Sequence, residues 1–527
     1  MDYFRAKRFL DTLPDWETGT PPSGPLADYL PRMRALLARL DHPQRAFHTL
    51  IVGGTNGKGT VSSLVASLAQ HTGRRVGLYT SPHLHTQRER IRVNGEILDK
   101  DDWAEAVHTL YDSTRDFGRE ELGSFSKFEA LTALAAHLFS KAQVEWAVFE
   151  VGLGGRYDAT NAWDSRAAIL TRVGLDHVGI LGHTIEEIAA DKVHIARSGC
   201  PLFTTASQAP GVTELLQNTC DEWDIALHTA PVLQHHTRTT HYAENAGLAL
   251  TAARHLGLAP APPSDERLIA EHVWPGRFEQ ASADPLVLLD GAHNPQAARE
   301  LASSLRTLRN RWTLIVGVGA GHDAQGIIEA LAPLADRIIL TASDHPKAVP
   351  ADELAPCVPE GVTAEVAPSF SAALQRGQRC ASAGSPLCVA GSLFLVARAR
   401  EFFNLPCERD SITEEMALEN LQCLEIACTA LGLSYQSFSD EGSLIRVEHR
   451  TRPFYFWRNK HPFNDYMGAR IAEDKAFQYE IFARLGLPVP NTMQVFNPLA
   501  DPRFDRYKTH QTLDDIVADI EQRFAFP

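Results

Sequence analysis

Gly54-Thr55-Asn56-Gly57-Lys58-Gly59-Thr60 is the stretch of sequence that decides the fold. An apolar run at residues 50–52 precedes it and is typical of a buried strand, and apolar residues at helical spacing follow it. A strand, a glycine-rich turn with a lysine and a helix present backbone N–H groups and a positive helix end to phosphates. The stretch therefore predicts a phosphate-binding loop in an α/β protein, against the alternative of a chance glycine turn.

The loop departs from the generic phosphate-binding pattern at two positions. That pattern has glycine where Val52 stands, and serine or threonine directly after the lysine, where Gly59 stands. The lysine of the pattern is present, and Lys58 is expected to reach the β- and γ-phosphates of a nucleotide. The Thr60 hydroxyl is expected to ligate Mg²⁺. Taken alone, the loop supports only the prediction that the chain binds a nucleotide.

Further apolar runs recur along roughly the first 400 residues, each between stretches that read as helix. They lie at residues 146–151, 167–171, 286–289, 313–318, 337–341 and 387–390. Strands that alternate with helices form parallel sheets with crossover helices. Pro/Gly breaks at residues 272–277 and 404–406 divide the pattern. We therefore expect a P-loop parallel-sheet ATPase domain over residues 1–275, a smaller Rossmann-like α/β domain over 276–405, and a C-terminal α/β extension over 408–527.

Composition excludes several classes of protein. The chain of 527 residues is 44% hydrophobic and 22% charged, which is typical of a soluble globular protein, and its formal net charge is −15. A nucleic-acid scaffold would need a basic surface instead. The sequence shows no apolar run of about 20 residues, no signal peptide at its start and no CxxC pair among eight cysteines. We expect a cytoplasmic protein with reduced thiols and neither a membrane nor a nucleic-acid partner.

The loop and a series of later blocks resemble the folylpolyglutamate synthase/dihydrofolate synthase family, which is related to the Mur ligases. The blocks occur in the family's order. They are Tyr79-Thr80-Ser81-Pro82-His83-Leu84, Glu89-Arg90-Ile91-Arg92-Val93-Asn94-Gly95, Glu150-Val151-Gly152-Leu153-Gly154-Gly155-Arg156-Tyr157-Asp158-Ala159-Thr160-Asn161, Asp176-His177, Asp191-Lys192, Pro275-Gly276-Arg277-Phe278 and Asp290-Gly291-Ala292-His293-Asn294-Pro295. This order across roughly residues 20–403 makes coincidence a poor explanation.

The resemblance implies a set of site residues. The implied metal ligands are Thr60, Ser81, Glu150 and His177. The implied ATP-binding residues are Gly54, Thr55, Asn56, Gly57, Lys58, Gly59, Thr60, Asn245, Arg277 and Asp290. The implied catalytic residues are Lys58, Glu150, His177, Lys192, Asp290 and His293, with Lys192 carbamylated. The implied residues for the acid substrate are Ser81, Pro82, His83, Arg90, Arg156 and Asp158.

Structural roles compete with three of these assignments when each residue is taken alone. A single histidine such as His177 is more often a hydrogen-bonded core or surface residue, and Lys192 alone reads as a lysine on a helix surface. Asp290 precedes a helix that is expected to begin near Pro295, so its carboxylate would serve equally well as an N-cap.

The implied reaction joins L-glutamate to dihydropteroate, to tetrahydrofolate (poly)glutamate, or to both, through an acyl phosphate. ATP is the implied co-substrate, with two Mg²⁺ ions and room for a monovalent cation, and the ligase part is expected to be a monomer. Two alternatives stay open. One is the same mechanism on a non-folate acid and amino acid in a peptide or poly-amino-acid pathway, since the family's lysine-containing turn is replaced by Gly319-Ala320-Gly321-His322-Asp323. The other is a non-catalytic nucleotide-binding scaffold.

The C-terminal extension carries a second, smaller resemblance. Ile471-Ala472-Glu473-Asp474-Lys475-Ala476-Phe477 and Leu485-Gly486-Leu487-Pro488-Val489-Pro490-Asn491-Thr492 resemble the lead-in of ATP-grasp ligases. The alternative is an unrelated helical appendage. If the resemblance holds, the sequence given stops before the nucleotide-binding core of that fold, and we assign the extension no catalysis.

Overall fold

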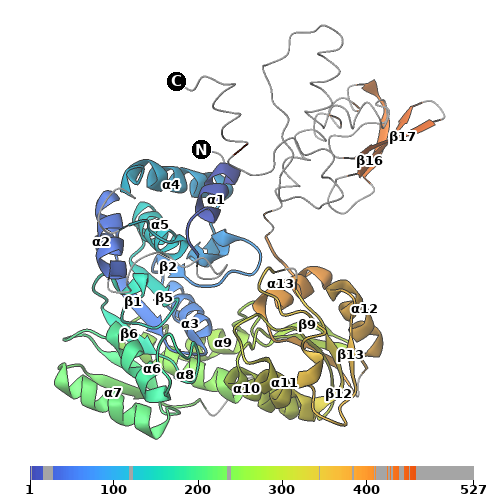
Figure 1. Ribbon diagram of the computed structural model, residues 1–527. Coiled ribbons are helices and arrows are strands. Elements are labelled where there is room, and N and C mark those ends of the chain that lie inside the picture. Colours follow the sequence, from blue (N-terminus) through green and yellow to red (C-terminus); the bar gives the residue numbers. More distant parts are fainter. Residues whose placement is uncertain are drawn as a thin grey trace. The chain divides into compact units, whose positions relative to one another are not determined.

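The computed structural model divides into two compact units, Met1–Asp410 and Ser411–Pro527. It describes residues 1, 3–15, 28–117, 123–233, 239–343, 345–382, 385–408, 410, 424, 428, 431–437, 444–449, 452–457 and 515. Within the first unit, two α/β layer structures follow one another along the chain (Figure 1). In the described part of the chain, no helix is both long and apolar enough to cross a membrane.

The first layer structure is built on an eight-stranded sheet with strand order β4-β3-β2-β5-β1-β6-β7-β8. The strands are β1 (His48–Gly53), β2 (Val76–Tyr79), β3 (Ile91–Val93), β4 (Glu96–Ile97), β5 (Trp146–Glu150), β6 (Ala167–Leu170), β7 (Leu202–Thr205) and β8 (Leu227–Ala230). All neighbours pair in parallel except β3, which is antiparallel to both β2 and β4. The central strands β1, β5 and β6 are almost wholly buried, which explains why they read as continuous apolar runs.

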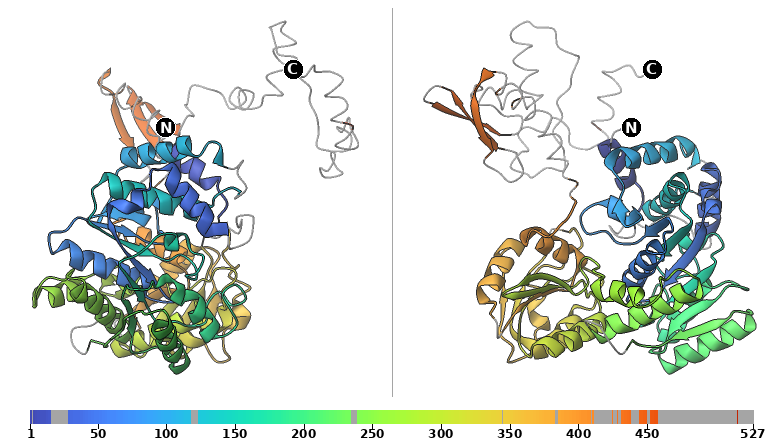
Figure 2. Two further views of the ribbon diagram at one scale, coloured as in Figure 1. Left: turned by 90° about the vertical axis from the view of Figure 1, so that its left-hand side faces the viewer. Right: turned by 180° about the vertical axis from the view of Figure 1, so that it is seen from behind.

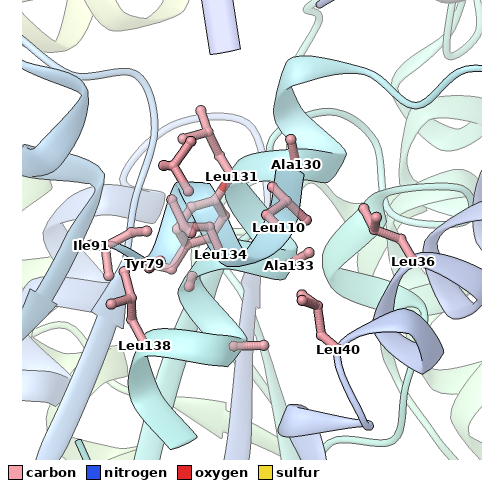
Figure 3. Packing of buried hydrophobic residues seen from close by; sticks show 14 of the residues in the cluster. Leu36, Leu40, Tyr79, Ile91, Leu110, Ala130, Leu131, Ala133, Leu134 and Leu138 are labelled. Atoms are coloured by element: carbon pink, nitrogen blue, oxygen red, sulfur yellow. The ribbon is translucent and has the colours of Figure 1, made fainter. Parts of the chain in front are cut away.

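Helices cover both faces of this sheet. They are α1 (Tyr3–Asp11), α2 (Tyr29–Arg39), α3 (Lys58–Gln70), α4 (Lys100–Ser113), α5 (Lys127–Lys141), α6 (Ile185–Lys192), α7 (Pro210–Glu222), α8 (Thr240–His255) and α9 (Ser264–Glu271). On one face α1, α2, α4 and α5 pack over β2 and β5, where Tyr79, Ile91, Leu131, Leu134 and Leu138 interlock (Figure 3). On the same face α6 and α7 pack over β6 and β7, while α3 and α8 cover the opposite face.

The second layer structure is a six-stranded sheet with strand order β13-β12-β11-β14-β10-β9. Its strands are β9 (Glu279–Ala283), β10 (Leu286–Leu289), β11 (Trp312–Val316), β12 (Ala335–Leu340), β13 (Ala364–Val366) and β14 (Leu387–Ala390), and only β9 runs antiparallel to its neighbour. The helices α10 (Pro295–Leu308) and α11 (Ala324–Leu331) cover one face. The helices α12 (Phe370–Cys380) and α13 (Leu393–Phe402) cover the other, as the view from behind in Figure 2 shows.

The predicted α/β fold class is confirmed, and each apolar run of the sequence is a strand, with ends that differ by at most two residues. The short strands β2, β3, β4, β7, β8, β9 and β13 carry no comparable run and were not predicted. The chain passes from the first sheet to the second between α9 and β9, and the domain boundaries at residues 275 and 405 stay predictions.

The second unit is described over a small sheet. Its antiparallel strands are β15 (Ser434–Ser437), β16 (Leu444–His449) and β17 (Arg452–Trp457). Cys428, Ile445 and Val447 form the buried apolar cluster next to it. The segments 471–477 and 485–492, which resemble an ATP-grasp lead-in, lie outside the described residues.

Candidate active site

A cleft of about 1890 Å³ lies between the two sheets of the first unit. The loop at residues 54–60 and the segments that follow β5 and β6 line one side of it, and segments that follow β10, β11 and β12 line the other. Loops at the carboxyl ends of parallel strands are where α/β folds hold their ligands. Residues that lie far apart in the sequence therefore lie together in the lining of the cleft.

The phosphate-binding loop has the shape that its glycines allow. Gly54 and Gly57 have φ angles of 131° and 91°, which residues with a side chain rarely adopt. A Cβ on Gly57 would also lie 2.3 Å from Asn245 Oδ1, so α8 packs directly against the loop. Lys58 is the first residue of α3, and its Nζ donates a hydrogen bond to the carbonyl of Thr55 at 3.1 Å. Residues 55–60 thus line the cleft at the N-terminal end of α3, a position that favours an anion.

Gly59 explains one departure from the generic loop pattern. A Cβ at this position would lie 3.2 Å from Trp274 Nε1 and 3.5 Å from Glu150 Oε2. The space that serine or threonine occupies in a generic loop is filled here by the indole and the carboxylate. Glycine at position 59 therefore leaves room for the side chains of Trp274 and Glu150.

Glu150 ends β5 beside this loop, and its carboxylate accepts a hydrogen bond from the backbone N–H of Ser81 at 3.0 Å. Burial raises the pKa of the Glu150 carboxyl, although the Lys58 ammonium acts in the opposite direction. The protein thus holds a buried acid whose negative charge it does not fully compensate.

Lys192, the last residue of α6, is buried, and its Nζ donates to the carbonyl of Gly54 at 3.0 Å. Burial, followed by repulsion from Lys58, lowers the pKa of this amine to about 7. Lys192 is therefore not the exposed helix lysine that its sequence alone suggested.

His177 lies farther out, in the loop after β6. Its side chain is 42% exposed, its φ angle is 50°, and its backbone N–H donates to Asp176 Oδ1 at 3.0 Å. Ser81 and Glu150 are in contact, but the described residues contain no group of three His, Cys, Asp or Glu side chains that could hold a metal ion. The proposed set of Thr60, Ser81, Glu150 and His177 therefore stays a prediction.

Asp290 and His293 face the cleft from the second sheet. The Asp290 carboxylate accepts hydrogen bonds from the backbone N–H groups of Phe278 at 2.8 Å and Ala292 at 2.9 Å, and burial raises its pKa. It does not cap α10, because Asn294 does so by accepting from Ala297 N at 2.8 Å. The N-cap alternative for Asp290 is wrong.

His293 is held as a neutral imidazole. Its Nδ1 lies 2.8 Å from the carbonyl of Gly291, and burial, followed by the charge of Arg277, lowers its pKa to about 4. Since a carbonyl only accepts, Nδ1 carries the proton and Nε2 is left as an acceptor.

The residues expected on the acid-substrate side are arranged in two groups. Arg90 is buried, and its Nε donates to His83 Nδ1 at 2.9 Å, close to Ser81 and Pro82. Asp158 accepts four hydrogen bonds, from Gly152 N, Leu153 N, Thr160 N and Thr160 Oγ1, at 2.6 to 3.0 Å. It organises its own loop while lining the cleft.

Three further predicted residues lie in different surroundings. Arg156 is exposed and donates from Nε to His194 Nε2 at 3.0 Å. The Asn245 amide Nδ2 lies 3.1 Å from His241 Nε2, next to the phosphate-binding loop. Arg277 acts electrostatically on both Glu150 and Asp290.

Sequence reasoning singled out the turn at residues 319–323, which contains His322, but it missed His345 and Lys347, which also line the cleft from the second sheet. The ring of His322 lies 5.2 Å from that of His293, and His345 stacks on Phe394 at 3.8 Å, with Lys347 two residues further on. Backbone hydrogen bonds join the two loops, as Ala320 N donates to Lys347 O at 2.6 Å. Their position directly after β11 and β12 was the available signal.

A parallel-sheet domain with a phosphate-binding loop, facing a second α/β domain across a cleft, defines a nucleotide-dependent ligase of the Mur type. The comparisons agree, because residues 52–201 match the Mur ligase middle domain and residues 276–393 match the Mur ligase, glutamate ligase domain. The chain belongs to the dihydrofolate synthase/folylpolyglutamate synthase family.

Two curated relatives are similar to this chain over most of their length. The dihydrofolate synthase/folylpolyglutamate synthase of Bacillus subtilis is 33% identical over 359 residues, which are 62% of this chain and 83% of the relative. The enzyme of the same name from Escherichia coli is 32% identical over 391 residues, 71% of this chain and 90% of the relative.

Solved structures are similar as well. Mycobacterium tuberculosis folylpolyglutamate synthase complexed with ADP superposes with a TM-score of 0.70 at 27% identity, over 77% of this chain and 99% of that one. E. coli FolC in complex with DHPP and ADP gives a TM-score of 0.67 at 27% identity, over 77% and 98%.

Proposed function

We propose that this chain is an ATP- and Mg²⁺-dependent ligase that joins L-glutamate to dihydropteroate, to tetrahydrofolate (poly)glutamate, or to both, through an acyl phosphate. One observation carries the proposal. Lys58, Glu150 and Lys192 converge on the phosphate-binding loop at the first sheet, opposite Asp290 and His293 at the second. Family membership and the substrates named for the relatives support the same reading.

The reaction needs activation of a carboxylate, which is a poor electrophile. A carboxylate oxygen of the acid attacks the γ-phosphorus of ATP, the bond to the β,γ-bridging oxygen breaks, and ADP and an acyl phosphate result. The glutamate amine then attacks the acyl carbon, the C–O bond to phosphate breaks, and an amide, inorganic phosphate and a proton are released. Orientation in a closed cleft contributes more to such a step than a protein nucleophile would.

The residues near the loop suit a divalent cation. Glu150 is buried and burial raises its pKa, and Thr60 and Ser81 line the cleft beside it. We assign Thr60, Ser81, Glu150 and His177 as its ligands. When bound, Mg²⁺ would supply charge neutralisation for the transferring phosphoryl group. A second Mg²⁺ and a monovalent cation stay predictions.

Lys192 fits a carbamate better than a simple ammonium. An amine reacts with carbon dioxide only in its neutral form, and a pKa of about 7 leaves much of Lys192 neutral at physiological pH. Carbamylation would convert a buried cation into an anion beside the loop, where it could face a cation.

The other assignments follow the resemblance to the family. The loop residues Gly54 to Thr60 together with Asn245, Arg277 and Asp290 are assigned to ATP, and His293 to catalysis. Ser81, Pro82, His83, Arg90, Arg156 and Asp158 are assigned to the acid. The monomeric state of the ligase part and its cytoplasmic location stay predictions.

The test is a coupled assay with purified protein, Mg-ATP, L-glutamate and either dihydropteroate or tetrahydrofolate, read by ADP release and by mass spectrometry of the amide. We expect product with at least one acid. ADP release with neither folate acid, but with another carboxylic acid, would replace the substrate assignment. Mg-ATP binding in calorimetry without ADP release in the presence of any acid would leave only the non-catalytic scaffold, and failure to bind Mg-ATP would contradict the proposal.

A second candidate substrate pair is favoured by one observation. The loop Gly319 to Asp323 places His322 in the cleft, where the family has lysines. A neutral or weakly basic side chain there offers less attraction to the carboxylates of glutamate than lysine does. A different amino acid as the amine is therefore the alternative that the substrate screen should include.

A further inference from the structure

Asn56 of the phosphate-binding loop is hydrogen-bonded to Asn294 of the second layer structure, 238 residues away in the sequence. Asn294 Nδ2 donates to Asn56 Oδ1 at 3.1 Å, and Asn56 Nδ2 faces Asn294 Oδ1 at 3.4 Å. Both side chains are more than nine-tenths buried. The two amides therefore join the loop to the opposite wall of the cleft in a place where water does not compete.

Asn294 is held in position by its own helix. Its Oδ1 caps α10 by accepting from Ala297 N at 2.8 Å, and Pro295 occupies the first helical position. Serine, threonine and aspartate cap helices as well as asparagine does, but only asparagine keeps an N–H₂ group for a second partner. Helix capping alone therefore does not explain why residue 294 is asparagine. Capping together with donation of a hydrogen bond to Asn56 does explain it.

The same face of α10 contacts the support of the loop. Glu300 Oε1 lies 3.5 Å from Arg172 NH1, and Glu300 Oε2 lies 3.1 Å from His241 Nδ1. A Cβ on Gly174 would lie 1.7 Å from Gln296 Oε1, so the backbone after β6 and α10 are in direct contact. Thr55 of the loop is tied to that same backbone, since its Oγ1 donates to Gly174 O at 3.1 Å.

We propose that Asn294 is a positioning residue for phosphoryl transfer: its amide sets the shape of the phosphate-binding loop through Asn56, and so makes ATP binding depend on this contact between the two walls of the cleft. The proposal rests on the proposed function only for the identity of the nucleotide. The loop's hydrogen bonds from Thr55 Oγ1 to Gly174 O and from Lys192 Nζ to Gly54 O tie it to the first layer structure, whereas the Asn294 amide ties it to the second. Asn294 itself touches no reacting atom.

The test compares Asn294→Ser, which keeps a capping oxygen and loses the amide donor, with the full-length protein. We expect about tenfold weaker Mg-ATP binding by calorimetry, corresponding to the loss of one buried hydrogen bond. In the steady state, the KM for ATP should rise and kcat should fall, with the KM for the acid unchanged. Ser369→Ala is the matched control, since it removes the cap of α12 on the far face of the same sheet. It should lower the melting temperature and leave ATP binding intact.

A double-mutant cycle separates positioning from a purely structural role. On an Asn56→Ala background, Asn294→Ser should have no further effect on ATP binding, because the partner of its amide is already gone. Wild-type ATP affinity in Asn294→Ser, or an equal loss on both backgrounds, would overturn the proposal. Mg-ATP binding is measured without any acid or amine, so a chain that makes no folate-type amide would contradict the proposed function and leave this test standing.

Discussion

Asn245 occupies the space that a Cβ on Gly57 would need, and Trp274 leaves little room for a Cβ on Gly59. Single residues therefore decide what this loop can hold. The shape of the loop follows from its glycines, while its charge comes from two lysines that approach from different helices, Lys58 and Lys192.

Lys58→Ala should abolish ligation, because Lys58 is the cation at the helix end where the phosphates are expected. Loss of one preorganised group that stabilises developing charge costs about 10²- to 10³-fold in kcat. ADP release and amide formation measure the effect. Lys141→Ala is the control, since Lys141 is half-exposed and paired with Glu105 on the surface. Substantial turnover by Lys58→Ala would contradict the assignment of this lysine to the phosphates.

Lys192 should become carbamylated as the pH rises through about 7. Burial lowers its pKa, so the amine is an unreactive ammonium below that pH and a neutral nucleophile above it. The carbamate carbon is observable by ¹³C NMR of protein in ¹³C-bicarbonate, and Lys192→Met supplies the blank spectrum. If the carbamate signal is absent both below and above about pH 7, the modification is refuted.

Among the secondary-structure elements, the helices α2 and α5 that cover the first sheet are joined by a buried ion pair. Arg32 and Glu129 form a wholly buried two-bond ion pair at 2.8 and 3.0 Å, and Glu129 also closes the capping box of α5 with Ser126. One carboxylate thus fixes both the start of a helix and its contact with a neighbouring one.

Arg32→Met should destabilise the protein by about 3–5 kcal/mol, because it leaves Glu129 buried without its counter-charge. Urea unfolding followed by circular dichroism measures the free energy. Arg267→Met removes an exposed pair with Glu271 and should change it by less than about 1 kcal/mol. Equal effects of the two variants would show that burial does not govern the strength of the Arg32 pair.

The strands also show which parts of the fold could be predicted from the sequence. Residues 49–53 and 146–150 are buried, so their apolar runs identify them as strands, whereas Leu227–Ala230 at the sheet edge is mostly half-buried or exposed and contains no apolar run. Motif order brought Lys58, Glu150 and Asp290 to one cleft. The contact of Asn56 with Asn294 and the positions of His322 and Lys347 depend on how two sheets face each other, which no local pattern specifies.

At the scale of the whole molecule, the chain carries more than the ligase fold. The solved relatives are matched over 98 and 99% of their length by 77% of this chain, and the remainder contains the second compact unit. Before that unit begins, Arg88 forms an ion pair with Glu408, so residue 408 is still bound to the first layer structure.

A chain truncated after Asp410 should keep its ligase activity. All the residues assigned to the site lie before that point, and the contact of Glu408 with Arg88 is retained. We expect kcat and KM values close to those of the full chain in the coupled assay. A soluble, folded truncation product without activity would mean that residues 411–527 contribute to catalysis, and the extension would then need a role in the mechanism.

The linker between the two sheets has a practical use. Gly276 N donates to Glu279, and Phe278 N to Asp290, so these residues move with the second sheet, while Ser63 Oγ holds His272 to the first. If the halves rotate relative to each other, these contacts leave Val273, Trp274 and Pro275 as the segment that would bend, and the indole of Trp274 lies against Gly59. The protein thus contains an intrinsic fluorophore in the segment that joins the two sheets. The difference in emission between wild type and Trp274→Phe would report opening and closing in real time, without an added dye.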